Sequence, residues 1–358
     1  MKILLLCWRD TGHPLGGGAE RYLQRVGEYL AAHGHEVTYF SARGPEQPSC
    51  DTIGGVKHLR RGGKFSVYLH GLWHTLTHRY DRIVDTHNGI PFFARLTHPS
   101  RTVLLIHHCH REQWPIAGRF IGRLGWFLES HVSPLVYRGS PQVTVSEPSK
   151  RELEEIGFRI TDIIYNGVDR PRNTHRPHPD GRTHIVTLSR LTPHKQVEHA
   201  IDCVAALAAS HPDLVLDIIG SGWWDDHIRS HAAQSPVAER IIVHGQVSEE
   251  RKHELLAAAS VLLMPSVKEG WGLAVIEAGL HGVPAVGYCE AAGLTEAIIN
   301  GHTGFTVTGF PALVDATDRL LNDDDLRTRL GEQARSYATT FSWEHTGARW
   351  QQLLEPRT

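Results

Sequence analysis

Short apolar runs alternate with longer amphipathic segments over most of the chain. In the first half, apolar runs typical of buried strands occupy positions 3–7, 36–41, 56–59, 82–86, 102–106 and 142–145. In the second half, similar runs lie at 185–188, 214–219, 241–244, 261–264 and 284–287. Segments with helical spacing of apolar residues separate them, at 19–33, 197–210, 251–259 and 273–281. This alternation predicts an α/β protein built from parallel sheets with helices on both faces.

The alternation is interrupted once. Between positions 169 and 182 the chain is rich in Pro, Arg and His and shows no apolar periodicity, which is typical of a linker. The sequence therefore predicts two doubly wound, Rossmann-like domains, at 1–168 and 183–340, followed by an amphipathic helix within 341–358. Because ligands of such sheets bind at the carboxyl ends of the strands, we expect the site in a cleft between the domains.

Composition narrows the class of protein. The chain has 358 residues, of which 41% are hydrophobic and 21% are charged, as in soluble globular proteins. A net charge of −2 argues against a general nucleic-acid binder. The 5 cysteines are scattered and show no CxxC spacing, which favours reduced thiols in a cytoplasmic protein. We interpret residues 1–8 as a first strand, not a signal peptide, and no apolar run approaches the ~20 residues of a membrane span.

Two carboxylates flank a glycine loop late in the chain. Glu269 and Glu277 lie on either side of Gly270-Trp271-Gly272, between a buried run and a helical segment. The glycines let the backbone approach a ligand closely, and the following helix begins with unpaired N–H groups that favour an anion. This arrangement suits a diphosphate with a sugar at one end and a ribose at the other. The alternative is a solvated loop residue and a helix-surface charge.

Two basic residues follow the first strand of the second domain. Arg190 and Lys195 can both reach a diphosphate at that strand end, Arg as a fork and Lys as a compact charge. A lone Arg–Lys pair is more often a solvated surface feature, but the strand-end position favours a site here. Further strand ends with glycine turns lie at 218–222 and 243–247, and each alone is a weak signal.

A glycine loop also follows the first strand. Positions 16–21 read Gly-Gly-Gly-Ala-Glu-Arg, so the last glycine of a dinucleotide-binding GxGxxG loop is missing. The second strand also ends without the acidic residue that would hold a ribose, so NAD is not expected. The chain has no GxxxxGK[ST] motif, which argues against a P-loop nucleotidase. The alternative to a phosphate-binding loop is a plain glycine-rich helix start.

Histidines gather where another strand ends. His107, His108 and His110 follow the buried run 102–106, and His87 and Asn88 end the neighbouring strand. Adjacent strand residues point to opposite faces and no second ligand cluster is evident, so no metal site is predicted. The register within the cluster stays open, and His87 is as often a core residue as a ligand.

In these motifs the chain resembles the retaining family-4 glycosyltransferases of the GT-B fold, the glycosyl transferases group 1. The resemblance covers nearly the whole chain and rests on the Glu-x7-Glu spacing, the strand-end Arg and Lys, the Gly-Gly-Ala-Glu-Arg loop and the strand-end histidine. It implies metal-independent transfer of a hexosyl unit from a UDP- or GDP-sugar to an acceptor hydroxyl, with no other cofactor. It also implies that the last helix packs back on the N-terminal domain.

The resemblance implies roles for individual residues. The catalytic set is His107, Arg190, Lys195 and Glu269, with His107 the best positional match to the family's sugar-facing histidine. The donor would be bound by Gly17, Gly18, Arg190, Lys195, Val247, Glu269, Gly270, Trp271, Gly272, Leu273 and Glu277. His87, Asn88, His108 and His110 are candidates for contact with the acceptor. Positive side chains and a helix dipole would take the place of a metal ion at the diphosphate.

The sequence leaves the acceptor open: a small molecule, a glycan and a lipid-linked molecule are all compatible with it. Aromatic and basic residues mix at 60–82 and 114–137. Such mixtures are typical of peripheral contact with the inner face of a membrane, but equally of helices that pack a core or line an acceptor pocket. A nucleotide-sugar epimerase of the same architecture and a non-catalytic transferase-like partner subunit are the alternative functions. The oligomeric state is not predicted.

Overall fold

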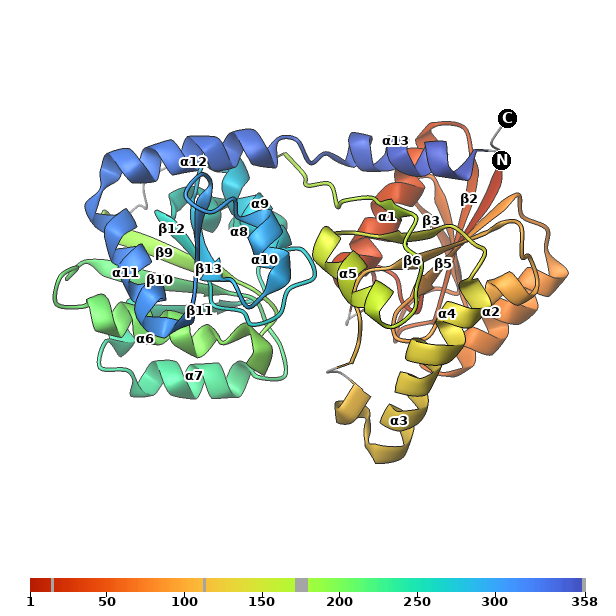
Figure 1. Cartoon of the computed structure of the whole chain (residues 1–358), viewed down its shortest axis with the longest axis horizontal. Coiled ribbons are helices and arrows are strands. Elements are labelled where there is room, and N and C mark those ends of the chain that lie inside the picture. Colours follow the sequence, from red (N-terminus) through yellow and green to blue (C-terminus); the bar gives the residue numbers. More distant parts are fainter. Residues whose placement is uncertain (14–15, 112–113, 171–179, 356–358) are drawn as a thin grey trace. The chain divides into compact units, whose positions relative to one another are not determined.

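The computed structural model describes residues 1–13, 16–111, 114–170 and 180–355 (Figure 1). The chain divides into two compact units. Unit 1 comprises Met1–Gly167 together with the chain from Ser342 onward, and unit 2 comprises Val168–Phe341. Most of the predicted linker, residues 171–179, lies outside the described residues.

Unit 1 contains a twisted, mostly parallel sheet with the strand order β3-β4-β2-β1-β5-β6-β7-β8 among its described residues. Its strands are β1 (Lys2–Leu6), β2 (Glu36–Ser41), β3 (Cys50–Ile53), β4 (Val56–Arg60), β5 (Arg82–His87), β6 (Thr102–Ile106), β7 (Gln142–Thr144) and β8 (Asp162–Ile163). Its longer helices are α1 (Gly18–Ala32), α2 (Ser66–Thr77), α3 (Arg119–Phe127), α4 (Ser133–Tyr137), α5 (Glu147–Glu155) and α13 (Trp343–Leu354), and a π-helical turn (Leu128–Val132) joins α3 to α4.

Strand β3 was not predicted, and it is antiparallel to β4. Gly54 and Gly55 connect the two strands, with φ angles of 57° and 81°. Two successive residues with positive φ make the tight turn that suits a two-residue hairpin. The hairpin therefore extends one edge of the sheet through turn chemistry, which the apolar pattern does not report.

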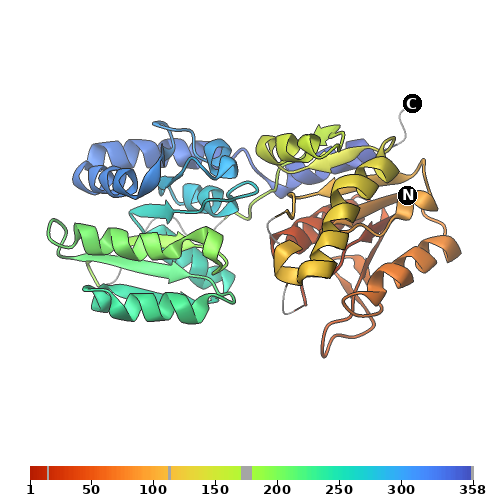
Figure 2. The ribbon, with the colours of Figure 1, turned by 60° about the horizontal axis from the view of Figure 1, so that its bottom comes forward.

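Unit 2 contains a parallel sheet with the strand order β11-β10-β9-β12-β13-β14. Its strands are β9 (Thr183–Leu188), β10 (Leu214–Ile219), β11 (Ile241–Gly245), β12 (Val261–Met264), β13 (Ala285–Tyr288) and β14 (Gly304–Val307). Its helices are α6 (Val197–Leu207), α7 (Asp225–Gln234), α8 (Glu249–Ala258), α9 (Leu273–Leu280), α10 (Ala292–Ala297), α11 (Gly309–Asn322) and α12 (Asp324–Ala338). Helices lie on both faces of each sheet (Figure 2), which confirms the prediction of two doubly wound units.

The strand order of each sheet reverses direction once, and this decides where ligands can bind. In unit 1 the chain runs from β1 outward to β2 and β4 and then returns to β5 on the other side of β1. In unit 2 it runs from β9 to β10 and β11 and then to β12 on the other side of β9. At such a switch point the loops that follow the two central strands diverge, which leaves a crevice at their carboxyl ends.

The last helix, α13, packs against α1 within unit 1. Trp350 is completely buried there, and its indole N–H donates to the hydroxyl of Tyr22 over 2.6 Å. The Tyr22 hydroxyl in turn donates to the carbonyl of Ile164 over 3.0 Å. Gly347 allows the close approach, because a side chain at this position would collide with the ring of Tyr29.

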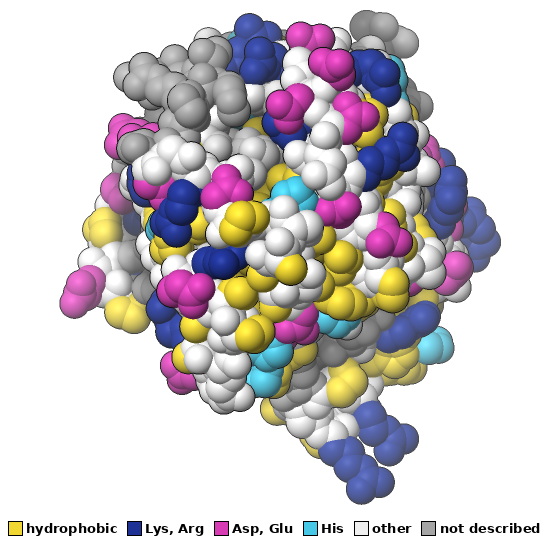
Figure 3. Space-filling view, turned by 90° about the vertical axis from the view of Figure 1, so that its left-hand side faces the viewer, with side chains coloured by type: hydrophobic (Ala, Val, Ile, Leu, Met, Phe, Trp, Pro, Cys, Tyr) yellow, Lys and Arg dark blue, Asp and Glu magenta, His cyan; other side chains and the backbone are white. Residues whose placement is uncertain are grey.

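The surface shows no sign of a strongly basic binding face on the side seen in Figure 3, where Lys and Arg are interspersed with Asp and Glu. Among the described residues, no helix combines the length and the apolar character needed to cross a bilayer. On this face, basic and acidic side chains are thus mixed and form no patch of single sign.

Candidate active site

The switch point of unit 2 brings together the loops that follow β9 and β12. Lys195, from the first loop, donates from its Nζ to Oε1 of Glu269, from the second, over 2.6 Å. The Ser266 hydroxyl donates to the same oxygen over 2.9 Å. The two loops are also joined through the backbone, where the N–H of Val267 donates to the carbonyl of His194 over 2.9 Å. Lys195 and Glu269, two of the predicted site residues, are therefore direct neighbours.

This ion pair is only partly exposed to solvent. The side chains of Lys195 and Glu269 retain 14% and 11% of their exposure. Both charges are partly desolvated, so without a ligand each charge is compensated mainly by the other. An anionic ligand at this crevice would compete with Glu269 for Lys195, and a hydroxyl-bearing ligand would compete with Lys195 for Glu269.

The glycine loop opens directly into helix α9. Gly272 is the N-cap residue, with φ of 85°, a left-handed conformation that favours glycine. The helix begins at the half-buried Leu273, and the first N–H groups of a helix have no partner within the helix itself; here that of Val275 donates to the carbonyl of Gly272 over 2.9 Å. Gly293, at the start of α10, packs against this loop, because a side chain there would collide with the carbonyl oxygen of Glu269. Neighbouring elements thus fix the backbone of Gly270–Gly272.

The side chain of Trp271 has a structural environment. It is 4% exposed and lies edge-on to Phe341, with ring centroids 4.8 Å apart. The indole of Trp271, one of the predicted donor-binding residues, therefore anchors the glycine loop to the body of unit 2.

Glu277 lies within the second turn of α9 and pairs with a residue that the sequence motifs did not single out. Its Oε1 accepts a hydrogen bond from Nζ of Lys252 over 2.7 Å, and Lys252 also donates to Glu249 over 2.9 Å. Lys252, on α8, is 7% exposed. In the sequence, Lys252 falls on the same helical face as the apolar Leu255 and Leu256. A lysine on a buried face usually has an acidic partner, and this spacing was the signal that could have pointed to Lys252.

Arg190 lies in the same loop as Lys195, and Val247 follows another strand at the same edge of the sheet. Arg190 is exposed and follows β9, and Val247 is half-buried and follows β11. Gly220 and Gly222 let the loop after β10 lie against the Arg190 loop, since a side chain at either would collide with the carbonyl of Ser189 or Leu191. The glycines after β10 thus allow its loop to pack closely against the loop after β9.

In unit 1 the loops after β1, β5 and β6 meet in the same way. Gly17 is the N-cap of α1, and its N–H donates to Oε2 of Glu20 over 2.8 Å. Arg9 holds the other oxygen of Glu20 over 3.1 Å. A side chain at Gly18 would meet nothing within 4 Å, so open space lies above the start of the helix. Glu20 therefore ties the backbone of the predicted phosphate loop at Gly17 to the side chain of Arg9.

His107 sits at the end of β6 with its ring edge-on to Tyr22, the centroids 5.2 Å apart. It is 7% exposed, and neither ring nitrogen has a hydrogen-bond partner among the described residues. Burial, with a smaller contribution from the nearby His110, lowers the pKa of His107 to about 4. The ring is therefore neutral at physiological pH and has unused hydrogen-bonding capacity.

A buried carboxylate, Glu129, organises the remaining histidines. It is 0% exposed, and one of its oxygens accepts from both the backbone N–H of His110, at 2.9 Å, and its ring Nδ1, at 3.1 Å. Its other oxygen accepts from the indole N–H of Trp114. His110 and Trp114 hold the pKa of Glu129 below its usual value despite burial. The sequence motifs missed Glu129 because it comes from the π-helical turn, 19 residues beyond His110.

His87 lies close to this carboxylate and to His110, with the two histidine ring centroids 6.3 Å apart. It is 0% exposed with no partner for its ring nitrogens among the described residues, and burial lowers its pKa to about 4. Ligand atoms of His87, His110 and Glu129 all lie within 4.8 Å of one another, close enough for a metal ion. The sequence alone did not show this grouping, because Glu129 comes from an element distant in the chain. The hydrogen bonds already accepted by Glu129 satisfy it without a cation.

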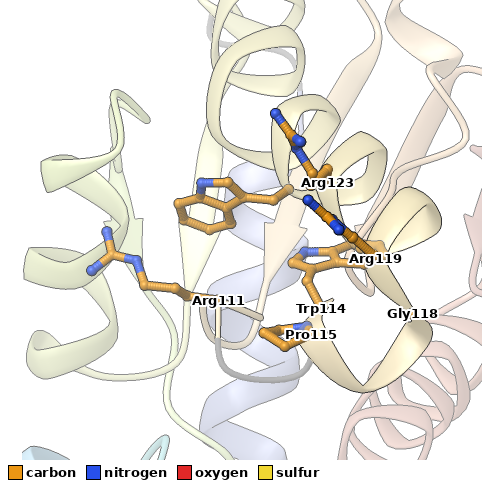
Figure 4. Close-up of a pocket in the computed structure, with 8 residues that line it drawn as sticks. Arg111, Trp114, Pro115, Gly118, Arg119 and Arg123 are labelled. Atoms are coloured by element: carbon orange, nitrogen blue, oxygen red, sulfur yellow. The ribbon is translucent and has the colours of Figure 1, made fainter.

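Two cavities in unit 1 lie near this cluster, and Trp114, which donates to Glu129, lines both. One, of about 520 Å³, has Asn88 and His110 in its wall, whereas His87 and His107 do not line it. The other, of about 460 Å³, is lined by Arg111, Arg119 and Arg123 around aromatic rings (Figure 4). His108 is half-buried beside His110, with ring centroids 4.4 Å apart. Of the predicted acceptor residues, Asn88 and His110 thus face a space in which a molecule fits.

Two doubly wound parallel-sheet units of this kind define the GT-B class, and comparisons place the chain within it. The family called Glycosyltransferase Family 4 matches residues 16–172, and the family called Glycosyl transferases group 1 matches residues 172–337. The GDP-mannose-dependent alpha-(1-6)-phosphatidylinositol monomannoside mannosyltransferase of Mycolicibacterium smegmatis is 30% identical over 375 residues, 96% of each chain. The chain belongs to the glycosyl transferases group 1, as its motifs predicted.

Other relatives are similar over a shorter length or in fold alone. A D-inositol 3-phosphate glycosyltransferase of Corynebacterium glutamicum (strain R) is 33% identical over 177 residues, 47% of this chain and 42% of that protein. The solved structure of sucrose-phosphate synthase from Thermosynechococcus elongatus has a TM-score of 0.81 at 20% identity and covers 98% of both chains. The Anabaena protein HepE, solved with UDP-glucose, has a TM-score of 0.75 at 18% identity over 99% of both chains. These two structures share the GT-B fold with this chain.

Proposed function

We propose that this protein transfers a hexosyl unit from a UDP- or GDP-sugar to an acceptor hydroxyl, with retention at the anomeric carbon and without a metal ion. The observation that carries the proposal is the Lys195–Glu269 pair, 2.6 Å apart at the switch point of unit 2 and directly before the N-terminus of α9. A sugar diphosphate offers both members a better partner: a phosphate for Lys195 and sugar hydroxyls for Glu269.

The remaining site residues have complementary roles in this proposal. Arg190, Lys195 and the first N–H groups of α9 stabilise the charge that grows on the departing diphosphate. Glu277 binds the ribose through the oxygen that Lys252 leaves available, and Lys252 fixes its position. His107, neutral and with unused ring nitrogens, orients the sugar. The acceptor oxygen bonds to the anomeric carbon as the carbon–oxygen bond to the diphosphate breaks, and the diphosphate takes the acceptor's proton.

Two features of the relatives support a nucleotide-diphosphate sugar but leave its base open. HepE was solved with UDP-glucose, and the mycobacterial relative is named for GDP-mannose. We also propose peripheral contact with the inner face of a membrane, because α3 presents exposed apolar side chains next to Arg119 and Arg123. The mycobacterial relative is named for a phosphatidylinositol mannoside acceptor.

A nucleotide-binding screen tests the donor site. Thermal unfolding is measured with millimolar UDP, GDP, ADP or dTDP, each in EDTA and in Mg²⁺. A nucleotide at about 100 times its Kd adds roughly 2.7 kcal/mol to the stability of the site-bearing unit. We expect one base to give this shift equally with EDTA and with Mg²⁺. A shift that needs Mg²⁺ would contradict metal independence.

Variants of the charged residues test the roles. Lys195→Ala and Glu277→Ala should each lower transfer by orders of magnitude while the protein stays folded. Glu332→Ala, at an exposed position of α12, is the matched control and should keep wild-type activity. Near-normal transfer by either site variant would refute the assignment. Consumption of the donor sugar into an isomeric sugar without acceptor would identify an epimerase instead.

A further inference from the structure

The 520 Å³ cavity of unit 1 has two chemically different ends. At its inner end are Asn88 and His110, which follow the neighbouring strands β5 and β6. Glu129 fixes His110 through its backbone N–H and its ring, and Asn88 donates to the thiol of Cys7 over 3.3 Å. These polar groups are therefore held in place before any ligand arrives, which favours specific contact with a hydroxylated group.

The outer walls of the cavity are apolar and come from two helices. Phe65 and Tyr68 lie at the start of α2, and Ile121 and Leu124 lie on α3. Phe65, Ile121 and Leu124 keep 67%, 50% and 50% of their exposure, so the walls are open to the outside. A volume of this size and an apolar lining are those of a site for an organic ligand.

Apolar exposure continues outward from the mouth of the cavity along both helices. Leu69 and Trp73 on α2 are 73% and 67% exposed, and Phe120 and Phe127 on α3 are 81% and 52% exposed. Large apolar side chains gathered in this way mark a surface that meets another apolar body. Their continuity with the cavity indicates one ligand that extends from the polar end to the outer helices.

We propose that this cavity holds the apolar tail of the sugar acceptor, and that the acceptor is an amphiphile. Its hydroxylated head lies against Asn88 and His110, and its hydrocarbon chain passes between α2 and α3. That the head receives the sugar rests on the proposed transferase function, whereas the tail site itself does not. A purely polar acceptor would leave the walls formed by Phe65, Ile121 and Leu124 in contact with water, at a cost that an alkyl chain removes.

Binding of alkyl glucosides tests the tail site in the full-length protein. Butyl, hexyl and octyl glucoside, each below its micellar concentration, are titrated while tryptophan fluorescence is recorded, because Trp8 and Trp114 line the cavity. Each methylene that leaves water should lower Kd about fourfold until the cavity is filled. A Kd that does not depend on chain length would overturn the proposal.

A pair of matched variants locates the effect. Leu124→Asp places a charge in the wall at a half-exposed position, where it can be solvated and the fold kept. It should abolish the dependence of Kd on chain length. Leu135→Asp makes the same change on α4, at a residue that is 71% exposed and outside the cavity wall, and should keep the wild-type dependence. Equal loss in both variants would mean general adsorption to apolar surface and would overturn the tail site.

The same protein samples separate this inference from the proposed function. A thermal shift with UDP or GDP but no chain-length dependence would overturn the tail site and leave the transferase proposal standing. Chain-length dependence without a shift by any nucleotide would support the tail site and count against the transferase. If Kd depends on chain length and a sugar is transferred to alkyl glucosides but not to free glucose, both the tail site and the transferase proposal are supported.

Discussion

The hydroxyl of Tyr22 links three segments of unit 1 that are far apart in the sequence. It accepts from the indole N–H of Trp350 on α13 over 2.6 Å and donates to the carbonyl of Ile164 over 3.0 Å. Tyr22, Trp350 and Ile164 are at most 2% exposed. The Tyr22 ring also lies against His107. We therefore expect Tyr22→Phe to loosen the C-terminal helix while it keeps the ring that supports the proposed catalytic histidine.

The expected cost follows from what the substitution leaves behind. Tyr22→Phe removes one oxygen and no carbon, so it opens little space and the large-to-small penalty is minor. It strands a buried N–H and a buried carbonyl, and each such group costs about 1–3 kcal/mol. The two together predict a loss of about 2–6 kcal/mol in the stability of unit 1.

Amide hydrogen exchange in mild urea measures this loss where it should occur. Peptides from α1 and α13 should lose protection, while peptides from β9, β10 and β12 in unit 2 should not change. Tyr29→Phe, a half-buried ring on the same helix, is the control and should shift protection by less than about 0.5 kcal/mol. An equally small effect of Tyr22→Phe would refute the reasoning, since it would mean that the stranded groups find other partners.

The remaining predictions concern pH and membranes. Because burial lowers the pKa of His87 to about 4, below its unfolded value near 6.5, the unfolded chain binds this proton first, and stability is lost as pH falls from about 6.5 to about 4. In His87→Leu, the stability lost between pH 7 and pH 4, measured by urea titration at each pH, should be smaller by roughly 3 kcal/mol. An unchanged loss would show that other groups cause the acid sensitivity. The protein should float with vesicles rich in anionic phosphatidylglycerol, and Arg119→Gln with Arg123→Gln should weaken this binding roughly 30-fold. Equal flotation with neutral phosphatidylcholine vesicles would contradict an electrostatic contribution.

The sequence by itself determined the layered architecture and the family. Strands β2, β6, β10 and β12 begin and end at the predicted residues, because a buried parallel strand is a short apolar run bounded by turn residues. The strand-end motifs were also readable, since they are local: a loop that binds phosphate needs glycines and a helix start within a few residues of one another.

Tertiary structure alone decided which of these residues meet. Lys195 and Glu269 are 74 positions apart, and Lys252 and Glu277 are 25 apart. Their pairing depends on the order of strands in the sheet and on the packing of α8 beside α9, neither of which has a local pattern. Glu129 was missed for the same reason, since only the folded chain brings the π-helical turn beneath His110. Periodicity reports which face of an element is buried, whereas a site is made by side chains whose distances are fixed only when the sheets are assembled.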